Sequence, residues 1–304
     1  FRSLVMVKRT LFFENSAYLS LQLEQLLITY PQEFVKSITI PIEDIGIIVI
    51  ESLHVTMSSA LTNKLMSHGV GIFCCDDRHI PSGLMLPLEG HTQQTERIRV
   101  QLDASLPLKK NLWQQTVSAK IVNQARLLNT RGEEVDNLLR WSREVQSGDL
   151  KNHEARAAVQ YWSRLFPWEG FTRHPEGESP NHLLNYGYSI LRGITARAIV
   201  SSGMLPMLGI FHKNKYNAFG LADDIMEPYR PFVDALVLDL VDSGEDFHSM
   251  KKEFKIHLMS IMRADVILDG QKSPLMVAMS RTTSSLFDCY AGRSRKILYP
   301  LYAG

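Results

Sequence analysis

The sequence predicts an α+β protein of two domains, a small N-terminal β-sandwich domain over residues 1–90 and a larger all-α domain over residues 91–304. The chain has 304 residues, more than one compact domain usually needs, and 45% of them are hydrophobic, which is enough to build an apolar core. Short apolar runs at strand spacing fill the first part, and apolar residues at helix-face spacing fill the rest. The pattern changes between residues 88 and 95.

The first part consists of short runs of alternating or continuous apolar residues, which favour a small sandwich of sheets. The run at residues 45–51 is almost continuous in β-branched side chains. One helix is expected to interrupt the strands at residues 56–68, capped by Thr56 or Ser58 and ended by Gly69. The other predicted strands are residues 10–14, 18–23, 25–29, 37–42, 70–75 and 84–88.

The second part shows the periodicity of amphipathic helices, with apolar residues three and four positions apart. Glycine and proline residues separate the periodic segments, as expected for helix ends and loops. The predicted helices are residues 93–103, 109–128, 133–145, 152–166, 181–202, 221–241, 247–261 and 274–290.

The charge of the chain is nearly balanced, with 33 basic and 32 acidic residues and a net charge of +1. Residues 1–100 carry 8 basic and 10 acidic residues, a net of −2, so the remaining 25 basic and 22 acidic residues give +3. A surface for nucleic acid must therefore be a local patch in the second part. No run of about 18 apolar residues occurs, so we expect no contact with a membrane.

Cysteine usage and the first residues favour a cytoplasmic location. The three cysteines, Cys74, Cys75 and Cys289, are odd in number and lack a CxxC spacing, so we expect small buried side chains rather than disulfides or a zinc site. The start of the chain lacks the long apolar core of a secretory signal. We expect Met6 to lie closer to the natural start than Phe1.

Three segments of the helical part carry side chains suited to metal chemistry. Glu154 lies one turn into a predicted helix among small residues, and His212 ends a predicted loop. Asp224 and Glu227 are three positions apart near a helix start, so their carboxylates are predicted to share a helix face. Two neighbouring acids repel unless a cation compensates them, and oxygen ligands with one imidazole suit Mg²⁺ or Mn²⁺.

Each of these residues also has a commoner structural explanation. Acids in a first helical turn are favoured by the helix dipole, which accounts for Asp224 and Glu227 without a metal. His212 could be a capping or core histidine, and Glu154 an ordinary solvated side chain. Spacing alone therefore leaves both interpretations open.

Taken in order along the chain, several segments resemble the family of CRISPR-associated protein one, the endonuclease and integrase that acquires new spacers. The resemblance runs through nearly the whole chain, and the ordered set is highly specific. The stretch Glu227-Pro228-Tyr229-Arg230 looks most like the type II versions of bacteria. The matching segments are residues 8–13, 18–19, 41–46, 120–124, 152–158, 184–188, 208–212 and 224–234.

The resemblance implies that Glu154, His212 and Glu227 are the catalytic residues and the ligands of Mg²⁺ or Mn²⁺. Many relatives carry Asp at the position of Glu227, so the longer side chain is a departure. Asp224 is implied to support the site. The implied reaction is transesterification, in which the 3′-hydroxyl of a captured DNA fragment attacks a phosphodiester of the CRISPR array.

The family also implies partners. These are double-stranded DNA (the protospacer fragment and the leader–repeat region), a second copy of the chain bound through the β domain, and a small CRISPR-associated companion protein that bridges two dimers. Other type II CRISPR proteins are further candidates. Basic residues near the site are candidate DNA contacts, although each is more often a solvated surface charge. They are Arg156, Arg164, Arg173, Lys213 and Arg230.

Two other functions fit part of the pattern. A catalytically idle DNA-binding scaffold of the same fold would have no need to keep Glu154, His212 and Glu227 together. An unrelated all-α metallohydrolase with an added β domain would not need DNA with free 3′ ends. Substrate choice separates the second alternative from an integrase.

Overall fold

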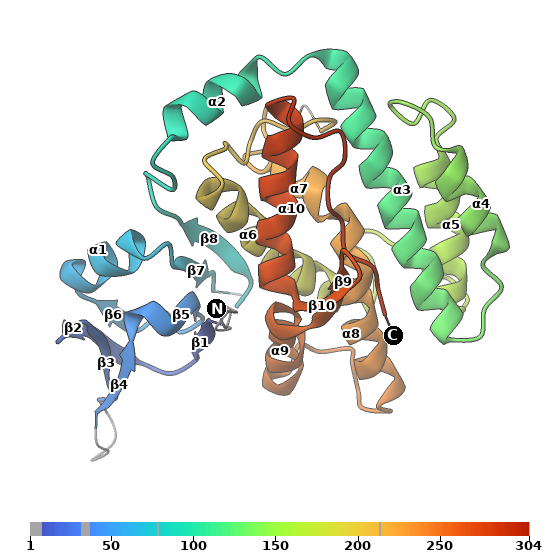
Figure 1. Ribbon diagram of the computed structural model, residues 1–304. Helices are drawn as coiled ribbons and strands as arrows, with labels where there is room; N and C mark the ends of the chain where they lie inside the picture. The colour runs from blue at the N-terminus through green and yellow to red at the C-terminus, as the bar shows by residue number, and fades with distance from the viewer. Residues whose placement is uncertain (1–7, 32–36, 78, 213, 304) are drawn as a thin grey trace. The chain divides into compact units, whose positions relative to one another are not determined.

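The computed structural model describes residues 8–31, 37–77, 79–212 and 214–303, and it divides the chain into two compact units, Phe1–Thr92 and Gln93–Gly304. The helices and strands of the two units make the chain an α+β protein (Figure 1). Met6 and Lys213 lie outside the described residues. Within the described part of the chain, no helix is long and apolar enough to cross a membrane.

The first unit contains two four-stranded sheets. In one, parallel pairs join β1 to β5 and β5 to β7, and β8 pairs antiparallel with β7. In the other, the order is β4-β3-β2-β6, with only β2 and β6 parallel. The strands are β1 (Arg9–Phe13), β2 (Ala17–Gln22), β3 (Gln25–Thr29), β4 (Ile38–Pro41), β5 (Ile45–Ile50), β6 (Val55–Met57), β7 (Gly71–Cys75) and β8 (Pro81–Met85).

Both sheets and the helix α1 (Ser59–Ser67) contribute to one apolar core. Ile48 of β5, Leu26 of β3 and Leu61 of α1 are all fully buried in it. Ser58, one of the two predicted caps, caps α1 by accepting a hydrogen bond from the backbone N–H of Leu61, so the helix begins at Ser59, after the short strand β6. Cys74 is exposed, contrary to the expectation for all three cysteines, whereas Cys75 and Cys289 are buried as expected.

The second unit is built mainly of helices around the long helix α3. Ser105 caps α3, and Pro107 occupies its first turn, so the helix starts before the predicted position. Figure 1 shows α3 beside α4 and α5. The helices are α2 (Gln94–Leu102), α3 (Leu106–Thr130), α4 (Asp136–Glu144), α5 (His153–Leu165), α6 (Asn181–Ser201), α7 (Gly220–Met226), α8 (Arg230–Asp242), α9 (Lys252–Met259) and α10 (Leu275–Tyr290).

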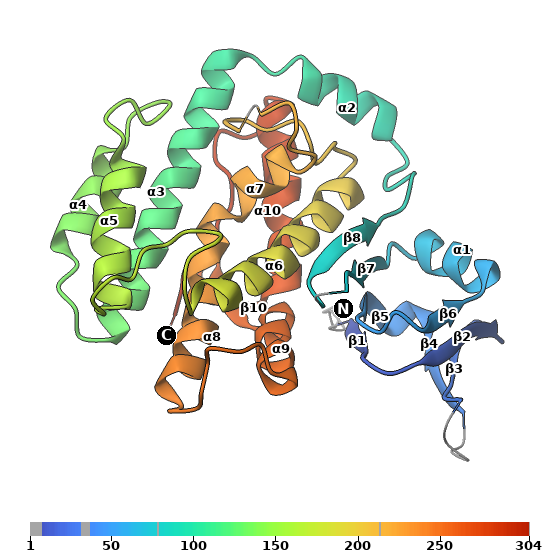
Figure 2. The same cartoon turned by 180° about the vertical axis from the view of Figure 1, so that it is seen from behind.

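The predicted helix at residues 221–241 is three consecutive pieces. The helix α7 ends at Met226, a 3₁₀ turn covers Glu227–Tyr229, and α8 begins at Arg230. Pro228 and Pro231 lack backbone N–H groups, so the regular α-helical hydrogen bonds cannot continue through this stretch. The view from behind shows α7 and α8 following one another beside α6 (Figure 2).

The second unit is not all-α, which corrects the prediction. Strands β9 (Asp265–Leu268) and β10 (Gln271–Pro274) form an antiparallel hairpin between the 3₁₀ turn Ser260–Arg263 and α10. The turn residues Asp269 and Gly270 both have positive φ, at 53° and 72°. An Asp-Gly pair is a strong signal for this kind of hairpin turn. The helix predicted at residues 247–261 is likewise shorter, because α9 begins only at Lys252.

The close packing of α6 on α8 depends on Gly187. A Cβ atom at this position would overlap Cγ1 of Val233. Both residues are buried, so neither can move into solvent. Only glycine therefore allows the two helices to approach as they do.

We predict that Gly187→Ala lowers the free energy of unfolding by about 1–3 kcal/mol, the usual cost of overfilling a packed core. Urea denaturation followed by circular dichroism measures the change. Ser201→Ala, at an exposed position of the same helix, is the control and should shift stability by less than about 0.5 kcal/mol. A Gly187→Ala variant as stable as the control would contradict the tight contact.

Candidate active site

The stretch from α7 to α8 carries four buried carboxylates, and three of them contribute to the candidate site. Asp224, Glu227 and Asp234 expose 0%, 5% and 1% of their surface. A buried charge is costly unless partners compensate it. Each of these three carboxylates contacts hydrogen-bonding or charged groups on other elements, and these contacts form the candidate site.

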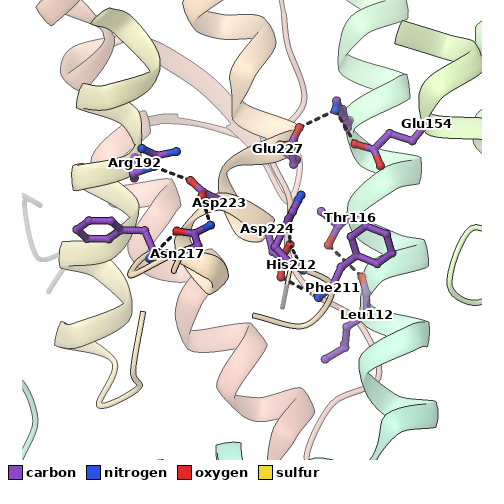
Figure 3. Close-up of polar contacts among 12 residues, drawn as sticks. Leu112, Thr116, Glu154, Arg192, Phe211, His212, Asn217, Asp223, Asp224 and Glu227 are labelled. Carbon is purple, nitrogen blue, oxygen red and sulfur yellow. Dashed lines mark hydrogen bonds and ion pairs between the residues drawn. The ribbon is translucent and has the colours of Figure 1, made fainter. Parts of the chain in front are cut away.

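Glu227 and Glu154 meet at the ammonium group of Lys120 in α3. The Nζ atom of Lys120 lies 2.6 Å from Oε2 of Glu227 and 2.7 Å from Oε1 of Glu154. Figure 3 shows both carboxylates directed toward α3 from opposite sides. Glu154 is held in place because the carboxylate of Asp149 accepts hydrogen bonds from the first two backbone N–H groups of α5, each at 2.9 Å.

The charges around Glu227 keep it ionised. Burial would raise the pKa of Glu227, but Arg230 and Lys120 outweigh burial and hold it at about 2. Burial would likewise lower the pKa of Lys120, yet the carboxylates of Glu227 and Glu154 raise it above its ordinary value. The Nε atom of Arg230 lies 2.8 Å from Oε1 of Glu227. The site is therefore a cluster of fixed charges.

Asp224 holds the loop that carries His212. Its Oδ2 accepts the backbone N–H of Phe211 at 2.9 Å, and its Oδ1 lies 2.5 Å from Nδ1 of His212. The hydrogen bond with Asp224 raises the pKa of the His212 imidazole, against the opposing effect of burial. Because a carboxylate only accepts, Nδ1 carries a proton in the neutral ring and the lone pair lies on Nε2.

The loop can approach Asp224 this closely because residue 209 is glycine. A Cβ atom there would lie 2.8 Å from Oδ2 of Asp224 and would also overlap the backbone oxygen of His212. Asp224 and Glu227 were predicted to share one helix face, but the two carboxylates contact different partners. Asp224 contacts the loop and Glu227 contacts α3.

Aromatic side chains hold the same loop against α3. The ring of Trp113 stacks on Phe211 with centroids 4.3 Å apart, and its edge contact with His212 is 5.8 Å between centroids. Trp113 is buried and comes from the helix that also carries Lys120. Sequence reasoning assigned no role to Trp113 or Lys120. A lysine beside Asn123 and Gln124 on an otherwise apolar helix face was the available signal.

Asp234 binds two tyrosine hydroxyl groups, and one of these tyrosines contacts the arginines of the site. It accepts hydrogen bonds from the hydroxyl groups of Tyr161, at 2.6 Å, and of Tyr188. Burial raises the pKa of Asp234 to about 6 in spite of these bonds. The guanidinium groups of Arg230 and Arg173 lie over the ring of Tyr188, at 4.5 and 5.3 Å from its centroid.

The candidate DNA contacts fall into two groups. Arg173 and Arg230 line a small cavity of about 140 Å³ together with Lys120 and Glu227. Arg156 instead lies over the ring of Trp141, and Arg164 donates to the backbone oxygen of Glu134. The structure thus brings two of the four described arginines to the cluster.

The donor set fits a divalent cation, although the side chains do not surround one as they stand. No three His, Cys, Asp or Glu side chains in the described ranges form a metal-holding group, since Lys120 lies between Glu154 and Glu227. Yet Oε2 of Glu227 is buried, and its charge is compensated by the Lys120 ammonium group 2.6 Å away. A buried carboxylate oxygen whose charge is already compensated by a cation also suits a hard divalent ion.

Comparisons with known proteins agree with one another. The chain is 37% identical over 282 residues to the CRISPR-associated endonuclease Cas1 of Neisseria meningitidis, covering 92% of this chain and 91% of that protein. A casposase bound to integration product superposes with a TM-score of 0.77 at 19% identity, over 95% of this chain and 92% of that one. A Cas6-RT-Cas1–Cas2 complex gives 0.73 at 18% identity, over 95% and 36%.

The family model also covers most of the chain, including α5, the His212 loop and the Glu227 turn. It is described as CRISPR associated protein Cas1 and matches residues 11–267. The resemblance in the sequence is thereby confirmed, and an unrelated metallohydrolase is excluded. This chain belongs to the Cas1 family of CRISPR-associated proteins.

Proposed function

We propose that this chain is a metal-dependent DNA endonuclease and integrase that inserts new spacers into a CRISPR array. One observation carries the proposal: in a member of the Cas1 family, Glu154 and Glu227 converge on a single cation beside an imidazole that Asp224 orients. The likeness to a casposase described as bound to integration product adds support at the level of the fold.

In the proposed reaction, Glu154, Glu227 and Nε2 of His212 would hold Mg²⁺ or Mn²⁺. When bound, the ion would activate the attacking 3′-hydroxyl and stabilise negative charge on the phosphate and on the target-strand oxygen that leaves as the new bond forms. Asp224 keeps the His212 ring in the tautomer whose Nε2 lone pair is free to bind. Arg230 and Arg173 add positive charge next to Glu227, where a phosphate of DNA would lie.

The two units are proposed to have separate roles. Residues 91–304 form the catalytic domain, and residues 1–90 form a β-sandwich that joins two copies of the chain. Double-stranded DNA and a small companion protein that bridges two dimers complete the assembly in the cytoplasm, as in a type II system. The solved Cas6-RT-Cas1–Cas2 complex and a Cas1 structure described as a complex with DNA support these partners.

The proposed function is tested by strand transfer in solution. Purified protein should join a DNA duplex with free 3′-hydroxyl ends to a leader–repeat target in Mn²⁺ or Mg²⁺, and a chelator should abolish joining. A gel of labelled DNA measures the covalent product. Joining in metal-free buffer would overturn the metal mechanism, and DNA binding without joining would favour the idle scaffold.

Each proposed ligand should be needed for the reaction. We expect Glu154→Gln, His212→Ala and Glu227→Gln each to lower strand transfer by more than about 100-fold, since losing a ligand costs more than losing an outer contact. Glu144→Gln, at an exposed position of α4, is the matched control and should keep full activity.

Circular dichroism should accompany these assays, because Glu227→Gln leaves Lys120 and Arg230 with less compensation and lowers stability as well. Near-normal strand transfer by a folded variant would remove that residue from the ligand set.

Asp224→Asn should weaken the reaction without abolishing it. The amide no longer favours the Nδ1–H tautomer as strongly, and such outer contacts cost about 10–100-fold in metal affinity or activity. Titration of Mn²⁺ against the rate of strand transfer should show a raised midpoint. Asp223→Asn is the control, since Asp223 contacts Arg192 and Asn217 instead of His212. An unchanged midpoint in Asp224→Asn would reduce Asp224 to a helix-dipole acid.

A further inference from the structure

Lys120 occupies the place between the two carboxylates that a divalent ion would share. Its Nζ atom is within 2.7 Å of both Glu154 and Glu227, and only 13% of its side chain is exposed. No third group can enter between atoms in direct contact. Binding of a divalent ion to both carboxylates therefore requires the ammonium group to leave.

A cation is obligatory here even without a metal. Two carboxylates held close together repel, and Glu227 is buried, so an uncompensated pair would destabilise the folded chain. The elements that carry them, α5 and the turn Glu227–Tyr229, both pack on α3. The charge of Lys120 thus keeps the site assembled.

Lys120 contacts both carboxylates directly. The ammonium group donates a hydrogen bond to Oε1 of Glu154 and forms an ion pair with Oε2 of Glu227. Arg230 lies on the other oxygen of Glu227, so the carboxylate keeps a partner if Lys120 moves away. The flexible four-carbon stem of lysine lets Nζ leave without a shift of α3.

We propose that Lys120 is the resident counter-cation of the Glu154–Glu227 pair and that a divalent ion binds by displacing its ammonium group. The inference rests on the proposed function for the metal itself. Lys120 then has two opposite effects: it stabilises the metal-free protein, and it raises the Kd for the divalent ion. An ordinary structural lysine would have only the first effect.

The test is binding of Mn²⁺ alone to the full chain, measured by isothermal titration calorimetry without DNA. Lys120→Met keeps an unbranched side chain and removes the charge. We expect its Kd for Mn²⁺ to fall by about tenfold or more, since the ion no longer competes with a buried cation. Lys110→Met, an exposed position of α3, is the matched control and should bind as the wild type does.

Thermal unfolding gives a second readout. In chelator, Lys120→Met should melt below the wild type, and Mn²⁺ should raise its Tm by more than it raises that of the wild type. Lys120→Arg keeps the positive charge and is the second variant to measure if Lys120→Met does not fold. A planar guanidinium can bridge two carboxylates firmly, so Lys120→Arg should bind Mn²⁺ more weakly than the wild type.

The outcomes separate this inference from the proposed function. A Kd for Mn²⁺ that is unchanged or higher in folded Lys120→Met overturns the displacement while leaving the metal site in place. An unchanged or lower Kd in Lys120→Arg does the same. Wild-type and Lys120→Met proteins that both fail to bind Mn²⁺ would overturn the metal site and the displacement together.

Discussion

The second unit depends on the compensation of the buried acids between α7 and α8. Asp224, Glu227 and Asp234 lie in turn on α7, the 3₁₀ turn and α8, and all three are almost entirely inaccessible to water. Each carboxylate needs partners from another element, and the partners come from α3, α5, α6 and the His212 loop. Because each buried carboxylate must be compensated by a partner from another element, this pairing also holds the helices together.

Stability alone does not explain why such charges are buried. A buried ion pair loses hydration on folding, and a well-packed apolar replacement is often equally stable or more so. The Glu154–Lys120–Glu227 cluster lies beside an oriented imidazole and two arginines. Burying so many charges in a core lowers the free energy of unfolding. The proposed reaction accounts for the cluster better, because a reaction at phosphate needs fixed charges that do not reorganise.

Much of this architecture follows from local sequence patterns. Periodicity predicted the strand-rich and helix-rich parts, and α2, α5, α6 and α10 lie within a few residues of their predicted bounds. The errors have specific causes. Apolar periodicity continues through Pro228 and Pro231, so it concealed the break between α7 and α8. The hairpin at Asp269 and Gly270 was overlooked because its strands are only four residues long.

The candidate site is harder to predict from the sequence than the fold is. Glu154 and Glu227 were singled out, but their convergence on α3 is a tertiary contact that no spacing reveals. Lys120 lies in the matching segment 120–124 but was given no role, since a lysine in a long helix is ordinarily solvated. Its burial is visible only when the partners that compensate it are in place.

Glu154, His212 and Glu227 are proposed to form one divalent-metal site from which Lys120 withdraws. Anomalous X-ray diffraction from crystals of the protein grown with Mn²⁺ tests it most directly. We expect one strong anomalous peak within coordination distance, about 2.0–2.3 Å, of both carboxylates and Nε2 of His212, with the Lys120 ammonium moved away. A peak elsewhere, or an ammonium group still bridging the two carboxylates at saturating Mn²⁺, would contradict this metal site and the displacement of Lys120.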